Sequence, residues 1–325
     1  MQPGSRIYVA GHLGLAGSAI SRALKGRGYQ NLLLRPRSEL ELTDRVAVRA
    51  LFERERPEYV FLAAAKAGGI LANKSQPAEF IYQNLAIQTN VMEEARRAEV
   101  KRLLFLAASC IYPRDCPQPM RESHLLTGPL EFTNQPYAVA KIAGVEMCWS
   151  YNRQYGTRFL TAVPNNLYGP GDNYDLESGH VLAAFIRKFH EAKAGAAQSV
   201  TLWGTGKPRR ELLHSDDMAE ACVTLMGLPD GRFDQLVASD PASPQPPLVN
   251  IGRGEDYSIG EIAERVREVV GFRGGIEWDL SKPDGAPRKL LDASRMKAMG
   301  WSPRISVDEG LRGAYRDFLA RFHRR

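Results

Sequence analysis

The chain of 325 residues has 44% hydrophobic and 25% charged residues, a composition typical of a globular protein with about two domains. Its net charge of +6 is compatible with an anionic substrate, but no long run of Lys and Arg indicates a nucleic-acid surface. No apolar run approaches the ~20 residues of a membrane-spanning helix.

The N-terminal residues lead directly into an apolar segment, which leaves no room for a signal peptide. The four cysteines show neither CxxC pairing nor zinc-like spacing with histidine. We therefore expect a reduced, cytoplasmic protein without a metal site.

Apolar segments rich in strand-forming residues alternate with helical patterns along the first half of the chain. The expected strands cover residues 6–11, 32–35, 59–65, 102–108 and 158–163. Asp44 has the residue type of an N-cap, for a helix that ends before Pro57. This alternation predicts an α/β fold with a Rossmann-type, doubly wound parallel sheet that carries helices on both faces.

Beyond about residue 164 the pattern loosens, although residues 259–270 again indicate a helix and the Pro-rich stretch 241–247 an exposed loop. We expect a smaller C-terminal α/β substrate-binding domain that is interleaved with returns to the sheet. The cofactor domain is predicted to cover residues 1–170 with returns near 212–256. The substrate domain is predicted to cover residues 171–211 and 257–325.

Residues 11–17, GHLGLAG, follow the first expected strand and precede a helix. In such a turn Gly11 allows a tight bend, Gly14 lets the backbone approach a pyrophosphate and Gly17 lets helix and strand pack closely. The free N–H groups and the dipole of the helix N-terminus attract the phosphates. The second strand is followed by cations, among them Arg37, and not by a carboxylate, so a 2′-phosphate would find charge-assisted partners and NADP(H) is the expected cofactor.

Tyr137 and Lys141 are four residues apart in an expected helix, which places them on one face. An ammonium close to a phenol favours the phenolate, so the tyrosine could exchange a proton with a developing alkoxide. A half-buried tyrosine beside a solvated lysine is the commoner meaning of this spacing. Together with a nicotinamide pocket, the pair would form the acid–base half of a reductase site.

Seven longer motifs then make the chain similar to one family of enzymes. They are GHLGLAGSAI (11–20), LAAAKAGGI (62–70), SCIYP (109–113), NQPYAVAKIAG (134–144), NLYGPGDN (166–173), WGTGKPRREL (203–212) and SKPDGAPRKLLD (281–292). With them the chain resembles the GDP-L-fucose synthases, in the extended short-chain dehydrogenase/reductase superfamily. The resemblance implies epimerisation of GDP-4-keto-6-deoxy-D-mannose at C3 and C5, followed by reduction at C4 with NADPH.

The resemblance also implies roles for individual residues. Cys110 and His180 would be the base and the acid of the epimerisation, although alone they could be a small buried residue and a surface residue. Tyr137 would protonate the C4 oxygen, and Lys141 would lower its pKa and bind the nicotinamide ribose. The other implied cofactor contacts are Gly11, Gly14, Leu15, Ala16, Gly17, Arg37, Leu42, Ala63, Ala65, Leu106, Ser109, Pro164, Asn166, Leu167 and His180.

The implied GDP-sugar contacts are Asn166, Lys188, Trp203, Arg210 and Asp284. Trp203 suits a base face and Arg210 a diphosphate. Lys188 stands where the family commonly has an arginine, so that a point charge replaces a bidentate fork. Without the resemblance, Lys188 and Arg210 could equally be solvated surface charges.

Ala108 departs from the pattern, because it lies four residues before Tyr112, where the superfamily has its catalytic serine. The loss of one such hydroxyl donor typically costs on the order of 100-fold to 1000-fold in rate. Ser109 is adjacent, but successive side chains of a strand point to opposite faces, so without a bulge it should not substitute. The chain could be an engineered alanine variant, a natural homologue with altered chemistry, or a slow enzyme that uses water or Ser109. We expect NADPH and GDP-sugar binding to survive and the reduction to be impaired.

Two other functions stay open. A related NADPH-dependent nucleotide-sugar 4-ketoreductase would need Tyr137 and Lys141, but neither Cys110 nor His180. A non-catalytic NADP-binding regulator would need none of these proton-transfer groups. The resemblance further implies a homodimer, which the helices near residues 77–100 and 137–155 could form.

Overall fold

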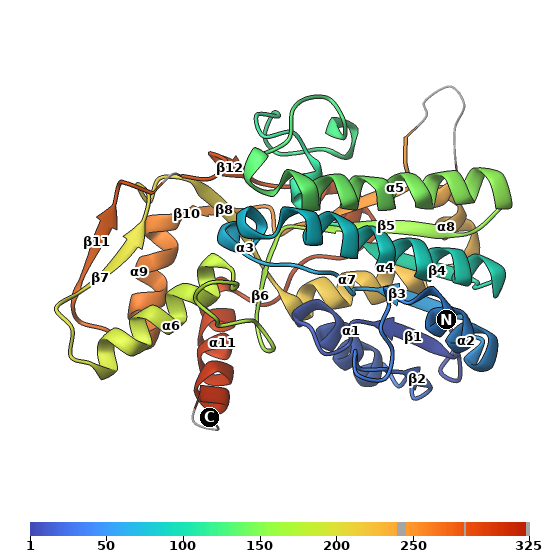
Figure 1. The fold of residues 1–325 in the computed structure, drawn as a ribbon, viewed down its shortest axis with the longest axis horizontal. Coiled ribbons are helices and arrows are strands. Elements are labelled where there is room, and N and C mark those ends of the chain that lie inside the picture. Colours follow the sequence, from blue (N-terminus) through green and yellow to red (C-terminus); the bar gives the residue numbers. More distant parts are fainter. Residues whose placement is uncertain (239–244, 283, 323–325) are drawn as a thin grey trace.

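The computed structural model describes residues 1–238, 245–282 and 284–322, which form a larger and a smaller lobe (Figure 1). The larger lobe contains a six-stranded, wholly parallel sheet of order β2-β1-β3-β4-β5-β9. Its strands are β1 (Ile7–Ala10), β2 (Leu32–Leu33), β3 (Tyr59–Leu62), β4 (Arg102–Leu106), β5 (Phe159–Pro164) and β9 (Leu248–Ile251). The predicted Rossmann-type sheet is confirmed.

Helices cover both faces of this sheet, and each face has its own apolar core. Along β1, Tyr8 belongs to one core, whereas Ile7 and Val9 belong to the other, as the alternation of a strand requires. The first core is covered by α2 (Arg45–Glu55), α4 (Pro77–Arg97) and α5 (Gln135–Tyr155). The second is covered by α1 (Leu15–Gly26), α7 (Ser215–Gly227) and α8 (Asp230–Val237).

The smaller lobe has a third apolar core, in which Phe185, Phe189 and Phe318 are buried. One of its sheets has four strands, namely β6 (Asn166–Tyr168), β8 (Arg209–His214), β10 (Asp256–Ser258) and β12 (Arg288–Lys289). A second sheet pairs β7 (Ser199–Trp203) with β11 (Gly275–Asp279). The helices of this lobe are α6 (Val181–Ala194), α9 (Ile259–Val270) and α11 (Val307–Phe322).

The two lobes are interleaved along the chain. As expected, α7, α8 and β9 return to the larger lobe after the first excursion. The predicted substrate domain 257–325 needs a correction, because Leu291, Met296 and Trp301 are buried in the cores of the larger lobe. Their apolar side chains draw this segment, with α10 (Ser294–Ala298), back against the sheet. Of the expected Pro-rich loop, residues 241–244 lie outside the described part of the chain.

Local signals explain where the helices begin and end. The Asp44 carboxylate caps α2 by accepting hydrogen bonds from the N–H groups of Val46 (2.8 Å) and Ala47 (3.1 Å). Helix α9 has the predicted bounds, begins at the capping box of Ser258 and Glu261, and ends at a C-cap Gly271 in the left-handed region.

The parts of the chain that the structure describes contain no helix that is both long and apolar enough to cross a bilayer. They also contain no group of three or more His, Cys, Asp or Glu side chains placed to hold a metal ion. All four cysteines are free and buried.

Candidate active site

The glycine turn between β1 and α1 forms a cradle that side chains would fill. Gly11 has a φ of 84°, and a Cβ on it would lie 2.7 Å from the backbone nitrogen of Ala64. A Cβ on Gly17 would lie 2.1 Å from the carbonyl oxygen of Gly11. Gly14 is the N-cap of α1 and provides no side-chain cap, and the buried Nδ1 of His12 has no hydrogen-bond partner. The open helix end and this unpartnered nitrogen fit the phosphates of a dinucleotide.

The other predicted cofactor residues gather near the same edge of the sheet. Leu15 and Ala16 form the first turn of α1, and the remainder follow or end parallel strands, namely Ala63, Ala65, Leu106, Ser109, Pro164, Asn166 and Leu167. This carboxyl edge is where doubly wound sheets bind ligands. The carbonyl of Leu42 accepts a hydrogen bond from Asn90, whereas Arg37 extends into solvent, with 76% of its side chain exposed and Glu41 at 2.6 Å.

Tyr137 and Lys141 lie on the first turns of α5, as predicted. The Nζ atom of Lys141 donates to the carbonyl of Leu106 at 2.9 Å and lies 5.7 Å from the centre of the Tyr137 ring. Burial lowers the pKa of Lys141 to about 8. Burial and, more weakly, the nearby Cys110 raise the pKa of Tyr137, which is opposite to the lowering expected from Lys141. Tyr137 therefore holds its proton, which is the state that a proton donor requires.

Ala108 extends β4 with backbone angles of −157° and 157° and is half-buried. The following Ser109 begins a 3-10 turn, η1 (Ser109–Ile111), and is buried. Its hydroxyl donates to Oδ1 of Asn165 at 2.9 Å. The hydroxyl is thus engaged by Asn165. Ser109 lies in a 3-10 turn and not on a strand, so the expected alternation of strand side chains does not apply to it, and that Ser109 does not replace the usual serine stays a prediction.

Cys110 follows β4 of the larger lobe, and His180 directly precedes α6 of the smaller lobe. Cys110 lies in η1 with only 6% of its surface exposed, and burial raises the pKa of its thiol. His180 is the N-cap residue of α6, and the surrounding protein lowers the pKa of its imidazole. Both shifts favour the uncharged side chain. Proton transfer by Cys110 and His180 therefore needs a nearby group that stabilises the thiolate or the imidazolium.

The segment after β3 joins the loop of His180 to the tyrosine. The N–H of Gly69 donates to the carbonyl of Ser178 at 3.0 Å. A Cβ on Gly68 would lie 3.3 Å from that same carbonyl oxygen and 3.3 Å from the ring of Phe80. The Phe80 ring meets Tyr137 edge to face, with 6.2 Å between the ring centres. Through Gly68, Gly69 and Phe80, the structure thereby brings the loop that precedes His180 close to Tyr137.

The predicted substrate residues of the smaller lobe surround an open aromatic face. Trp203 is 48% exposed, and the Nζ atom of Lys188 lies 5.8 Å from the centre of its ring. Lys282, which the sequence did not indicate, lies 5.6 Å from that ring. Asp284 accepts hydrogen bonds from the N–H (2.9 Å) and hydroxyl (2.7 Å) of Thr205, and so closes the turn after Trp203.

Arg210 and Asn166 lie where the smaller lobe meets the larger one. A Cβ on Gly285 would lie 3.0 Å from the Arg210 guanidinium and 3.9 Å from Ile70, which follows β3. The amide of Asn166 donates to the carbonyl of Glu211 at 3.0 Å. Both predicted contacts are therefore placed between the lobes.

The sequence does not predict a buried polar cluster that forms around Glu211, near the turn of Cys110. The Glu211 side chain is fully buried and accepts hydrogen bonds from Asn165 Nδ2 (2.6 Å), the N–H of Gly254 (2.6 Å) and the N–H of Leu291 (2.9 Å). The only signal in the sequence is a carboxylate that precedes two leucines in the β8 motif.

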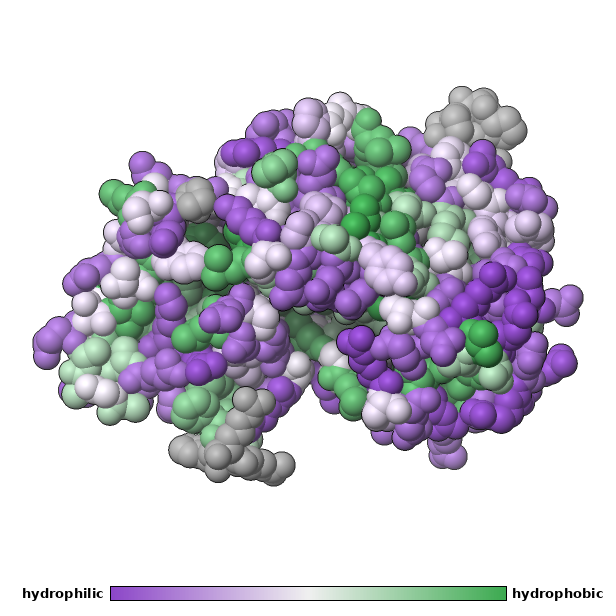
Figure 2. Space-filling view, viewed as in Figure 1, coloured by the Kyte–Doolittle hydropathy of each residue, from purple (hydrophilic) through white to green (hydrophobic). Residues whose placement is uncertain are grey.

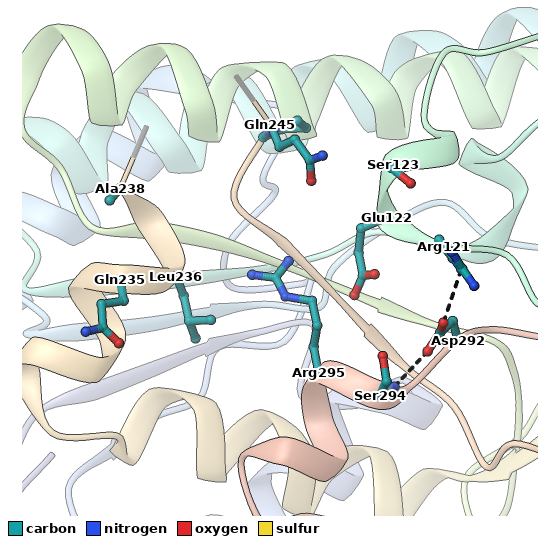
Figure 3. A pocket seen from close by; sticks show the side chains of 11 residues that line it. Arg121, Glu122, Ser123, Gln235, Leu236, Ala238, Gln245, Asp292, Ser294 and Arg295 are labelled. Atoms are coloured by element: carbon teal, nitrogen blue, oxygen red, sulfur yellow. Dashed lines mark hydrogen bonds and ion pairs between the residues drawn. The ribbon is translucent and has the colours of Figure 1, made fainter. Parts of the chain in front are cut away.

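A separate cavity of about 640 Å³ lies beside α8, whose residues Gln235 and Leu236 line one side of it (Figure 3). Arg121, Glu122, Asp292 and Arg295 line it, and Arg121 pairs with Asp292 at 3.5 Å. No predicted site residue lines this cavity, and its charges balance. It therefore indicates no ligand class.

Comparison with known proteins identifies the family. The model of the NAD dependent epimerase/dehydratase family matches residues 7–236. The chain is 51% identical over 319 residues to a putative GDP-L-fucose synthase 2 of Arabidopsis thaliana, covering 98% of this chain and 93% of that protein. It is 49% identical over 314 residues to the GDP-L-fucose synthase of Escherichia coli (strain K12), covering 97% and 96%. The chain belongs to the GDP-L-fucose synthases of the NAD dependent epimerase/dehydratase family.

A solved structure extends the similarity within this family. The GDP-mannoheptose C4 reductase of Campylobacter jejuni, which has NADP bound, matches with a TM-score of 0.86 and 40% identity over 98% of this chain and 99% of that one. The GDP-L-fucose synthase fold thus also serves a protein named for C4 reduction alone.

Proposed function

We propose that this GDP-L-fucose synthase family member converts GDP-4-keto-6-deoxy-D-mannose to GDP-L-fucose, by epimerisation at C3 and C5 and reduction at C4. The proposal rests on the presence in this chain of two pairs of residues that can exchange protons. Tyr137 and Lys141 serve the reduction, and Cys110 and His180 serve the epimerisation. The near full-length identity to named GDP-L-fucose synthases supports this assignment.

The epimerisation needs a base and an acid on opposite faces of the sugar. Cys110 takes the proton beside the C4 ketone, and the electron pair of the C–H bond moves into an enolate whose oxygen lies near Tyr137. His180 returns a proton to the other face of the carbon. Loss and return of the proton invert the configuration at C3 and at C5.

The reduction uses the tyrosine as proton donor. The turn of Gly11, Gly14 and Gly17 would hold the pyrophosphate of NADPH, which when bound would supply the hydride that is transferred to C4. Tyr137 gives its proton to the C4 oxygen, and Lys141 holds positive charge beside it. Arg37 is free to exchange Glu41 for the 2′-phosphate, which favours NADPH over NADH.

The nucleotide part of the substrate lies in the smaller lobe. The guanine base stacks on the exposed face of Trp203, with Lys188 beside it, and the diphosphate binds Arg210. Asn166 and Asp284 are the other two proposed contacts of the GDP-sugar. Because free thiols are typical of a reducing compartment, we place the activity in the cytoplasm.

The test is an assay of NADPH oxidation with GDP-4-keto-6-deoxy-D-mannose, combined with mass spectrometry of the product. We expect slow oxidation of NADPH and a product with inverted C3 and C5. A product reduced at C4 with unchanged C3 and C5 would support the second candidate, a GDP-sugar C4 reductase, which the Campylobacter jejuni relative favours. Incubation in D₂O without NADPH separates the two, since only the epimerase incorporates deuterium at C3 and C5.

A further inference from the structure

Glu211 on β8 is a fully buried carboxylate that is held from several sides. It accepts hydrogen bonds from Asn165 Nδ2 (2.6 Å), from the N–H of Gly254 (2.6 Å) and from the N–H of Leu291 (2.9 Å). A Cβ on Gly252 would lie 2.6 Å from its Oε1 atom, so the backbone after β9 also confines the carboxylate. The position of both carboxylate oxygens is therefore fixed by the surrounding chain.

Asn165 joins β5 of the larger lobe to β6 of the smaller lobe, and both ends of its amide are engaged. Its Nδ2 atom donates to Glu211 and to the carbonyl of Lys289 at 3.1 Å. Its Oδ1 atom accepts from the Ser109 hydroxyl at 2.9 Å and from Asn166 Nδ2 at 3.1 Å. An amide turned by half a rotation would set its oxygen against a carboxylate and a carbonyl, which are both acceptors. Glu211 thus decides which end of the amide faces Ser109.

The two groups that donate to Asn165 Oδ1 both belong to the candidate site. Ser109 directly precedes Cys110 in the 3-10 turn η1. Asn166, a proposed contact of the GDP-sugar, gives a second amide hydrogen bond to the carbonyl of Glu211 at 3.0 Å. The orientation of the Asn166 amide therefore follows from that of Asn165. One carboxylate fixes a residue beside the proposed base and a residue of the proposed substrate site.

An amide in place of the carboxylate could not satisfy the same donors. The Oε1 atom of Glu211 accepts from Gly254, and the Oε2 atom accepts from Asn165 and Leu291. Burial raises the pKa of Glu211, and these three donors oppose that rise. A glutamine would bring its NH₂ group against at least one N–H donor, whichever way its amide lies. The site therefore requires two acceptor oxygens.

We propose that Glu211 is a positioning residue, which through the amide of Asn165 holds both the turn of Cys110 and the Asn166 side chain in the arrangement that the reaction needs. The proposal rests on the function proposed above. Glu211 exchanges no proton with the substrate. It acts by fixing the directions in which Asn165 donates and accepts, and so joins the two lobes at the site.

The direct test needs no sugar and measures the rates at which iodoacetamide alkylates the cysteines, with peptide mass spectrometry to separate them. In Glu211→Gln we expect Cys110 to react at least ~tenfold faster, because η1 loses its anchor and opens more often. Cys148 and Cys222 are fully buried in the two cores of the larger lobe and should keep their rates. An unchanged rate for Cys110, or an equal acceleration of all three cysteines, would overturn the proposal.

Ser109→Ala tests the route of the effect. It removes the hydroxyl that donates to Asn165 and changes no charge, so Cys110 should be alkylated faster by a similar factor. The double variant Ser109→Ala/Glu211→Gln should react no more than about twice as fast as either single variant, because both changes release the same hydrogen bond. Factors that multiply in the double variant would show that Glu211 does not act through Ser109, against the proposal.

Glu277→Gln is the matched control. It makes the same chemical change at an exposed position of β11 in the smaller lobe, so all alkylation rates should equal those of the parent chain. An acceleration at Cys110 as large as in Glu211→Gln would show a general effect of charge and would also overturn the proposal.

A second readout uses the sugar. Deuterium incorporation at C3 and C5 should fall at least ~tenfold in Glu211→Gln, since a shift of about 1 Å in a catalytic group can cost on the order of 100-fold in rate. Incorporation at the rate of the parent chain would contradict the positioning role. If the parent chain itself incorporates no deuterium, the proposed epimerase function fails, whereas the alkylation rates still decide whether Glu211 holds the turn.

Discussion

Ala108 lies two residues beyond the end of β4, and its methyl group leaves the C4 oxygen of a bound ketone without a hydroxyl donor at this position. Tyr137 is still placed to give its proton, and Lys141 is still held by the carbonyl of Leu106. The residues that exchange protons are thus present, whereas the donor that stabilises the developing charge is missing.

Substitution Ala108→Ser should raise the rate of NADPH oxidation by on the order of 100-fold, because the new hydroxyl would hydrogen-bond to the C4 oxygen as charge develops on it. The measurement is the turnover of GDP-4-keto-6-deoxy-D-mannose followed by NADPH absorbance. Ala78→Ser on the exposed surface of α4 is the control and should leave the rate unchanged. An equal rate for Ala108→Ser and the parent chain would contradict this role of the position.

The pH dependence of the reduction should follow Lys141. Since burial lowers the pKa of Lys141 to about 8, the ammonium form is lost as the pH rises through that value. We expect kcat/KM for the reduction to fall about tenfold per pH unit above this point. Lys141→Arg keeps its charge, so any remaining activity should decline only at higher pH. A profile that stays flat from about pH 7 to pH 10 would argue against this assignment.

At the scale of elements, the turn between β1 and α1 is the most constrained part of the site. We expect Gly17→Ala to weaken NADPH binding at least tenfold and to lower the Tm, because its Cβ would lie 2.1 Å from the Gly11 carbonyl oxygen. Overpacking of this kind typically costs ~1–3 kcal/mol. Fluorescence titration with NADPH and thermal unfolding measure the two effects.

The same helix offers a matched control for that prediction. A Cβ on Gly26, in the last turn of α1, would meet nothing within 4 Å. Gly26→Ala should therefore leave NADPH binding unchanged and keep or slightly raise the Tm. If both variants bound NADPH equally well, the turn would not be the pyrophosphate site.

How far each element could be predicted depended on its length and pattern. Helix α9 matches its predicted bounds because an amphipathic pattern, a capping box and a final glycine all agree. Strands β3 and β4 end before the predicted residues 65 and 108, because the chain leaves the sheet there to form the crevice. Strand β12 has only two residues and no periodicity, so neither it nor the place of Lys289 could be predicted.

The candidate site likewise contains residues that a local pattern predicts and contacts that no local pattern predicts. Tyr137, Lys141 and the glycine turn follow from local spacing, and the structure places them as expected. The contact of Glu211 with Asn165 joins residues that are far apart in the chain. No local pattern encodes such a contact, so only the fold reveals it.

At the scale of the whole molecule, we propose that α4 and α5 form the interface of a homodimer. Their outer surface exposes Tyr82 (68%), Val139 (38%) and Tyr155 (49%). Figure 2 shows hydrophobic residues gathered over this part of the larger lobe. Two such helix pairs packed face to face would bury these side chains in a four-helix contact.

Light scattering should therefore give twice the chain mass of 36.1 kDa. Val139→Glu places a charge in the proposed interface and should yield the monomer mass. Val46→Glu on α2, where the side chain is 77% exposed, should leave the dimer intact. A monomer mass for the parent chain would refute the interface.

The repeated passage of the chain between its lobes has a mechanical consequence. The chain passes from one lobe to the other between β5 and β6, between β8 and α7, between β9 and β10, and between β12 and α10, so the described parts of the two lobes are joined by several connections and not by one. Neither lobe is one continuous stretch of sequence, and no single cut in the chain would release an intact half. Any motion of one lobe relative to the other would have to bend all of these connections together.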